Sequence, residues 1–204
     1  ILDRIAFPLP YNTDAVACKF GLGAELYLPD LDRAALCERT ARFLTDYWQT
    51  FPQHVNRFLA NDSRRAVKFT DSPEERIRSD IARVPILQEG YGAALMGRVD
   101  IGIKSDDVDP YRANVTIRHK EKHTLSNVNA HFQICNGQGV PNFEVLLAAT
   151  LRWCEICQPV HGSAGFAFIF ESKQESEYTQ QLFKRFPGFD FLDAGMFSMQ
   201  ARDI

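Results

Sequence analysis

The first predicted element is a strand from Val16 to Leu28, in which apolar and polar side chains alternate. Its apolar positions are Val16, Cys18, Phe20, Leu22, Ala24, Leu26 and Leu28. A period of two is typical of a strand that buries one face. Gly21 and Gly23 fall on the other face, where they favour a bend or a close backbone approach.

A helix is predicted directly after this strand. Its apolar positions are Cys37, Ala41, Leu44, Trp48 and Phe51, and Pro52 ends it. Pro29-Asp30 opens the helix, so we expect Asp30 to cap its N-terminus and Asp32 to lie at the positive end of its dipole. In the polar stretch that follows, from Asn61 to Arg83, Ser72-Pro73-Glu74-Glu75 predicts the start of a short helix.

Three alternating segments then predict three strands. Their apolar positions are Leu95, Val99, Ile101 and Ile103 in the first, Tyr111, Ala113, Val115 and Ile117 in the second, and Val128, Ala130, Phe132 and Ile134 in the third. The links between them, residues 105–110 and 120–124, are short and polar. Because a crossover needs a longer connection, we expect an antiparallel meander.

The last third of the chain predicts two more helices and two more strands. Asn142 is expected to cap a helix that runs to Cys157 and ends before Pro159. The predicted inner stripe of this helix is Phe143, Leu146, Leu147, Thr150, Leu151 and Cys154. The apolar run from Ala164 to Phe170 predicts a central strand that is covered on both faces. A helix over 175–186 and a strand over 196–201 complete the pattern.

These elements predict an α+β fold: an antiparallel sheet, made of a meander and strand-helix units, with helices packed on the sheet. A strand followed by a helix occurs at 16–51 and again at 126–157, which is compatible with a diverged internal duplication. No linker rich in Pro, Gly or Ser interrupts the chain. We therefore predict a single domain over residues 1–204, with halves at 1–90 and 91–204 as the alternative division.

Composition narrows the range of functions. The net charge of −3 argues against nucleic acid as a partner, because a basic face is needed to displace counterions from phosphates. No apolar run approaches the roughly 20 residues that span a bilayer, and no signal peptide is visible. The 5 cysteines are an odd number set in apolar patterns, which predicts free thiols in a reducing, cytoplasmic environment.

Several fragments resemble catalytic motifs but fail on geometry. Cys154 and Cys157 form a C-x-x-C pair at the C-terminal end of a predicted helix, where the dipole disfavours a thiolate. His119 and His123 fall in a charged turn between predicted strands. Gly162-Ser163-Ala164-Gly165 follows a helix and precedes a strand, the reverse of a nucleophile elbow. We therefore predict no catalytic residue, no metal and no cofactor.

The alternative function is a metal-dependent nuclease that uses Glu171-Ser172-Lys173. In such enzymes a carboxylate at a strand end binds Mg²⁺, and a nearby lysine steadies the attacking water. A second acidic ligand is also needed. The sequence contains one Pro-Asp pair, Pro29-Asp30, and it lies beside a different predicted strand.

An acidic loop is the best local candidate for a contact site. Asp106, Asp107 and Asp109 lie between two predicted strands. The simplest interpretation is a solvated hairpin tip, and the functional one is an acidic finger that contacts a basic partner surface. Together with Glu171, these residues form the candidate partner-binding set.

The C-terminal third carries a family resemblance. Its segments are Leu151-Arg152-Trp153-Cys154-Glu155, then Pro159-Val160-His161-Gly162-Ser163-Ala164-Gly165, then Lys184-Arg185-Phe186-Pro187-Gly188-Phe189-Asp190-Phe191. In this order they resemble the TsiV-like family of type VI secretion immunity proteins. Ala201-Arg202-Asp203-Ile204 is similar to the stretch before that family's closing Asn-Trp-Leu segment.

This resemblance implies a cytoplasmic antidote. Such proteins bind the toxic domain of an effector injected through a type VI secretion apparatus, and several relatives sit beside nuclease toxins. The implied function is neutralisation of a cognate type VI effector toxin, a nuclease by expectation, through occlusion of its active site. The mild acidity of the chain suits a cationic cleft. The family supplies no binding residues at the matched positions, which look structural.

Overall fold

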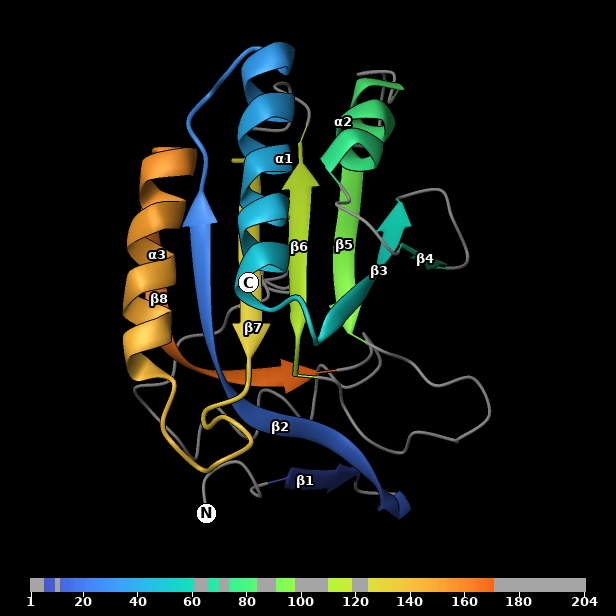
Figure 1. The fold of residues 1–204 in the computed structure, drawn as a ribbon, viewed down its shortest axis with the longest axis vertical. Helices are drawn as coiled ribbons and strands as arrows, with labels where there is room; N and C mark the ends of the chain where they lie inside the picture. Colours follow the sequence, from blue (N-terminus) through green and yellow to red (C-terminus); the bar gives the residue numbers. More distant parts are fainter. Residues whose placement is uncertain are drawn as a thin grey trace, which may run out of the picture.

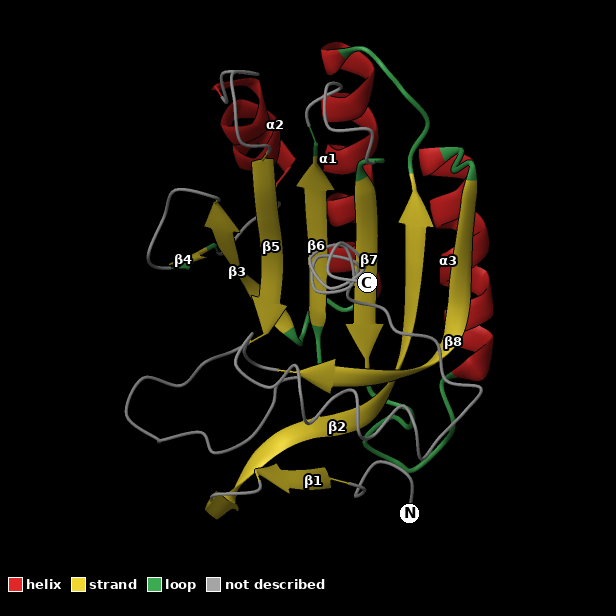
Figure 2. Ribbon diagram, turned by 180° about the vertical axis from the view of Figure 1, so that it is seen from behind, coloured by secondary structure: helices red, strands yellow, loops and turns green. Residues whose placement is uncertain are grey.

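The computed structural model describes residues 6–9, 12–60, 66–69, 74–83, 91–97, 110–118 and 125–170. These residues form an eight-stranded antiparallel sheet and three helices. The strands are β1 (Ala6–Leu9), β2 (Asn12–Tyr27), β3 (Val55–Ala60), β4 (Val67–Lys68), β5 (Tyr91–Gly97), β6 (Arg112–Ile117), β7 (Asn127–Phe132) and β8 (His161–Phe170), and the helices are α1 (Arg33–Thr50), α2 (Glu74–Arg83) and α3 (Phe143–Cys157). All three helices lie on one face of the sheet (Figure 1), and the view from behind shows its other face (Figure 2). The predicted α+β class is therefore confirmed.

The strands follow the order β1-β2-β7-β6-β5-β3-β4, and β8 pairs with β2. β5, β6 and β7 are antiparallel neighbours in chain order, which confirms the predicted meander. β5 contains Leu95 but begins at Tyr91, and the other apolar positions of that predicted strand lie outside the described residues. β3 and β4, which the alternation does not predict, extend the sheet beyond β5. The division of the chain into domains remains a prediction.

β2 organises the sheet because it pairs along both of its sides. One side pairs with β8 over Cys18–Tyr27, and the other pairs with β7 over Leu22–Tyr27 and with β1 nearer its start. β2 and β8 curve together across one end of the sheet (Figures 1 and 2). The predicted strand is confirmed and its apolar face is buried at Phe20, Leu22, Ala24 and Leu26. The prediction of a single buried face is wrong, because Glu25 on the other face is buried as well.

The core lies between the sheet and the helices and is rich in aromatic rings. The Phe51 ring, just after α1, lies 4.7 Å from the Phe132 ring of β7. The Tyr47 hydroxyl of α1 donates a 2.5 Å hydrogen bond to the His131 carbonyl of the same strand. Trp153 of α3 is fully buried and meets the Phe43 ring of α1 edge to face. These contacts fix α1 and α3 on the sheet.

The N-termini of α1 and α3 differ from two predictions. Asp32, not Asp30, caps α1: its Oδ1 accepts a 2.8 Å hydrogen bond from the Ala35 amide. An N-cap must reach the amides of the first turn, and Asp30 lies too far before Arg33 to do so. Asn142 occupies the predicted cap position of α3, but its side chain donates to the Gln133 carbonyl instead.

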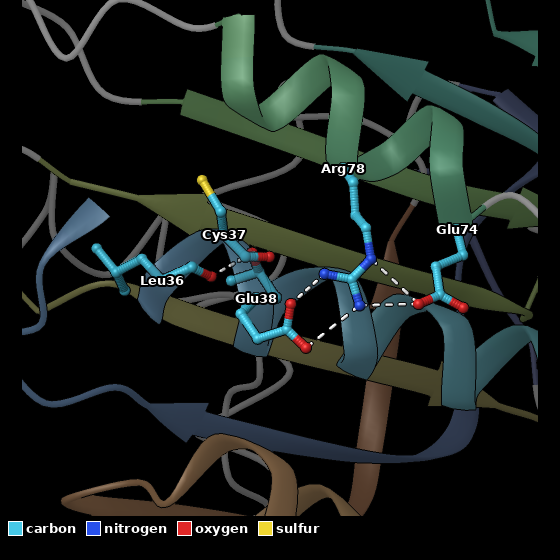
Figure 3. Close-up of polar contacts among 6 residues, drawn as sticks. Leu36, Cys37, Glu38, Glu74 and Arg78 are labelled. Carbon is cyan, nitrogen blue, oxygen red and sulfur yellow. Dashed lines mark hydrogen bonds and ion pairs between the residues drawn. The ribbon is translucent and has the colours of Figure 1, made fainter. Parts of the chain in front are cut away.

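A shared arginine ties α2 to α1. α2 begins at Glu74, as the sequence predicts. Arg78 donates to Glu74 of its own helix at 2.8 Å and also to Glu38 of α1 (Figure 3). The hydrogen bond from Arg78 lowers the pKa of Glu38, so this pair stays charged over a wide pH range. The contact orients the short helix against its longer neighbour.

β8 differs from its predicted role as a central strand. Among the described strands it pairs with β2 alone, so it lies at an edge, and its residues 161, 162, 164 and 166 are exposed. The strand is nevertheless apolar because both of its faces make contacts. Phe166 packs against α3 on one face, and Ala167 and Ile169 are buried on the opposite face. The predicted helix 175–186 and strand 196–201 lie outside the described residues.

Candidate protein-binding surface

α3 carries apolar side chains on two sides. The side that is buried in the structure differs from the predicted inner stripe. Its buried residues are Leu146, Ala149, Trp153 and Cys157. Of the predicted inner stripe only Leu146 is buried, while Phe143, Leu147 and Leu151 are exposed. Both sets repeat at helical spacing, so periodicity alone could not distinguish them. The large Trp153 ring decides the orientation by filling the space against α1.

Polar contacts to α1 hold α3 in this orientation. Asp46 of α1 accepts a 2.9 Å hydrogen bond from Trp153 Nε1 and a 3.0 Å ion-paired bond from Arg152 Nε. Arg152 also donates to Thr50. At the end of α3, Arg39 of α1 donates to the Cys157 carbonyl at 2.7 Å. α3 is therefore fixed to α1 at several points along its length.

The outward side of α3 presents an apolar surface that continues onto β8. The exposed fractions are 45% for Phe143, 63% for Leu147, 57% for Leu151 and 38% for Phe166 of β8. We name these four residues the α3 stripe. The Phe143 and Phe166 rings meet edge to face, with 5.4 Å between their centroids. A contiguous exposed apolar patch is typical of a protein interaction site, whereas scattered single apolar residues are not.

The α3 stripe has an acidic border. Arg152 lies on the α1 side of α3, because it pairs with Asp46, and the stripe lies on the β8 side. At 3.6 residues per turn, Glu144 and Glu155 project between these two sides, and both are exposed. The border of the stripe is therefore negative, since the single cation of α3 is paired with Asp46.

The face of the sheet opposite the helices carries a buried polar layer. Glu25, Asn127, Asn129 and His131 are all buried there, on β2 and β7. Asn127 donates to Glu25 at 2.7 Å, and Asn114 of β6 donates to Asn129 at 2.7 Å. The strand register places these side chains side by side on neighbouring strands. The polar residues of β7 alternate with its apolar ones, so the period of two that predicts its apolar face also marks this polar face.

His131 is the most perturbed group of this polar layer. Burial lowers the pKa of the His131 imidazole to about 4, and the charge of Arg112 on β6 contributes in the same direction. The ring is therefore neutral at pH 7, and its Nε2 has no hydrogen-bond partner among the described residues. A neutral buried imidazole among amides is suited to packing and specificity rather than to exposed contact with a partner.

The predicted partner-binding residues Asp106, Asp107, Asp109 and Glu171 lie outside the described residues, as does Lys173. His119 and His123 also lie outside them. In the part of the chain that the structure describes, no three His, Cys, Asp or Glu side chains are grouped so as to hold a metal ion.

The other motif-like fragments have structural roles. Cys157 lies at the C-terminal end of α3, as predicted, and burial raises the pKa of its thiol to about 12. This C-x-x-C cysteine is thus a protonated core residue at neutral pH. Gly162-Ser163-Ala164-Gly165 runs within β8, so it makes no strand-to-helix turn.

Comparisons with known proteins find similarity in structure but no sequence match. No protein-family model matches the chain, and no curated protein is significantly similar to it. The Pseudomonas aeruginosa T6SS protein PA0821 is similar in structure, with a TM-score of 0.66 and 14% sequence identity. The likeness covers 93% of this chain and 54% of that one, so this chain spans about half the length of its relative. It shows a shared fold. Among the helices in the described ranges, none has the length and apolar character to cross a membrane.

Proposed function

We propose that this chain is an immunity protein of a type VI secretion system, which binds and neutralises a cognate effector toxin. The observation that carries this proposal is the fold, which is similar over 93% of the chain to that of a T6SS protein. The C-terminal string that contains Trp153 and Gly162 resembles the TsiV-like immunity family and supports the same class.

The protein acts by binding rather than by turnover. Its exposed apolar α3 stripe is the kind of surface that a partner covers. Among the described residues, the histidine whose pKa is strongly lowered is His131, and it is buried, so it is not accessible to a substrate. The partner is an effector toxin, a nuclease in our proposal, and neutralisation takes place in the cytoplasm.

Growth of bacteria that express the toxin tests this proposal. The gene beside that of this chain is expected to encode the toxin, so its product is expressed in a heterologous host with and without this chain. We expect growth arrest by the toxin alone, rescue on co-expression, and co-purification of the two proteins. Arrest that persists despite abundant soluble chain contradicts the proposal.

A nuclease assay on the isolated chain tests the absence of turnover. The purified chain is incubated with plasmid DNA and Mg²⁺ or Mn²⁺, and no cleavage is expected. Metal-dependent cleavage that Glu171→Ala abolishes would instead establish the nuclease alternative.

A further inference from the structure

The α3 stripe and its acidic border indicate what kind of surface the partner presents. We infer that the α3 stripe is the contact surface for the toxin, and that the toxin offers it an apolar recess bordered by Lys and Arg side chains. This inference rests on the proposed function and assigns it to a face of the molecule.

The helix that carries the stripe is held in place before any partner binds. α3 is held to α1 through Asp46, and Phe143 is braced against Phe166 of β8 (5.4 Å between ring centroids). Binding therefore does not have to order the backbone of α3 or the Phe143 ring, which reduces the conformational entropy that association loses. Leu147 and Leu151, the most exposed members of the stripe, follow Phe143 along α3 and supply the apolar area to be buried.

The charges around the stripe select the partner. Glu144 and Glu155 border the stripe, while Arg152 is engaged with Asp46. An approaching surface with acidic residues at the same places would be repelled, and one with Lys or Arg there would be attracted. A nucleic-acid-cleaving domain carries such cations beside its substrate cleft, because it must bind phosphates.

The same charges disfavour a second copy of this chain as the occupant. A two-fold axis would pair two α3 helices antiparallel around Leu147 and Leu151. Glu144 of one copy would then lie beside Glu155 of the other at both ends of the contact. Like charges facing each other across an interface weaken it, so the charge pattern of the stripe suits an unlike partner.

Affinity measurements with a matched pair of variants test the contact. The purified product of the neighbouring gene, inactivated by one active-site substitution, is titrated with wild-type chain, Leu147→Asp and Val67→Asp. Val67 is a suitable control because it is 40% exposed on β4, at the opposite edge of the sheet from α3. We expect Leu147→Asp to weaken binding about 30-fold or more, and Val67→Asp to change it less than about 3-fold.

A charge-reversal pair tests the acidic border. Replacing both border residues, Glu144→Lys with Glu155→Lys, should slow association about 10-fold at low salt, and this effect should shrink as salt rises. Glu75→Lys on α2, at an exposed site far from α3, is the matched control for each border residue replaced singly, because one Glu→Lys replacement changes the net charge by the same amount at every site. Equal association rates for the double variant and the wild type would overturn the charge assignment.

The outcomes separate this inference from the proposed function. If wild-type chain binds and Leu147→Asp binds equally well, the surface assignment is wrong and the proposed function stands. If wild-type chain does not bind the toxin, the proposed function fails and this inference fails with it. If light scattering shows a dimer of the chain that Leu147→Asp separates, the stripe belongs to a second copy. Circular dichroism melts confirm that each variant is folded.

Discussion

The ring of Phe143 on α3 meets the ring of Phe166 on β8 edge to face, at an interplanar angle of 83°. Both rings are partly exposed, so the contact joins the helix layer to the sheet edge at the surface of the protein. An aromatic pair in this geometry contributes beyond its buried area. The contact thus combines a modest structural role with an exposed apolar surface.

Removing one ring separates these two roles. Phe143→Ala should lower the free energy of unfolding by about 1 kcal/mol, because it loses the aromatic pair. Leu147→Ala, one helical turn further on and more exposed, should change it by less than about 0.5 kcal/mol. Urea denaturation of both variants provides the comparison. Equal losses for the two would show that the ring contact adds nothing to stability.

The contact between Asp46 and Trp153 predicts a larger effect. Asp46→Ala leaves the Trp153 Nε1 without its acceptor and removes the ion pair of Arg152. We expect a loss of about 2 kcal/mol in unfolding free energy, since an unpaired donor in a packed site keeps its desolvation cost. Gln49→Ala, at an exposed position of the same helix, serves as the control and should be nearly neutral. A near-neutral Asp46→Ala would mean that packing alone orients α3.

Two glycines of β8 make a matched test of the pairing between β8 and β2. A Cβ on Gly162 would lie 2.5 Å from the Glu25 carbonyl oxygen, whereas a Cβ on Gly165 would meet nothing within 4 Å. Gly162→Ala should therefore destabilise the protein by about 2 kcal/mol, because the backbone of β2 must shift. Gly165→Ala should cost less than about 0.5 kcal/mol. Thermal melts of the two variants decide this, and an equally mild effect of both would contradict the observed register.

The buried His131 predicts how stability depends on pH. Its folded pKa, about 4, lies below the ordinary histidine value of 6.5. Between these two values the unfolded chain binds a proton that the folded chain does not. Stability from this group is complete above pH 6.5 and is lost as the pH falls towards 4. The loss amounts to at most about 3 kcal/mol, and it levels off at lower pH.

Urea denaturation between pH 4 and pH 7 measures this effect when the wild type is compared with His131→Asn. The variant lacks the titrating group, so its stability should fall less steeply over that window. Parallel curves for the two proteins would contradict the lowered pKa, because they would mean that His131 binds its proton at the same pH in the folded and the unfolded chain.

Elements with a single clear periodicity could be predicted from the sequence. β2, β6 and β7 alternate cleanly, and α1 has one apolar side ended by Pro52, so strands, helix and meander follow from local pattern. β3 could not be predicted in this way, because Asn56 and Arg57 interrupt its alternation. Its place in the sheet comes from pairing with β5, which is a long-range contact.

The α3 stripe could not be predicted from the sequence either, because its exposure also depends on a long-range contact. α3 has two apolar sides, and only the contact of Trp153 with α1 shows which one faces outward. From the sequence, the acidic residues at positions 106, 107 and 109 are instead the candidate contact site, and they lie outside the described residues. An apolar excess on a helix indicates a second contact surface only once its buried side is known.

Inhibition of the toxin by the purified chain is the most direct test of the central claim. The toxin encoded by the neighbouring gene is assayed on its nucleic-acid substrate while wild-type chain is added in increasing amounts. We expect the activity of the toxin to fall to background at one equivalent of chain. Full activity in the presence of a large excess of folded chain would contradict it.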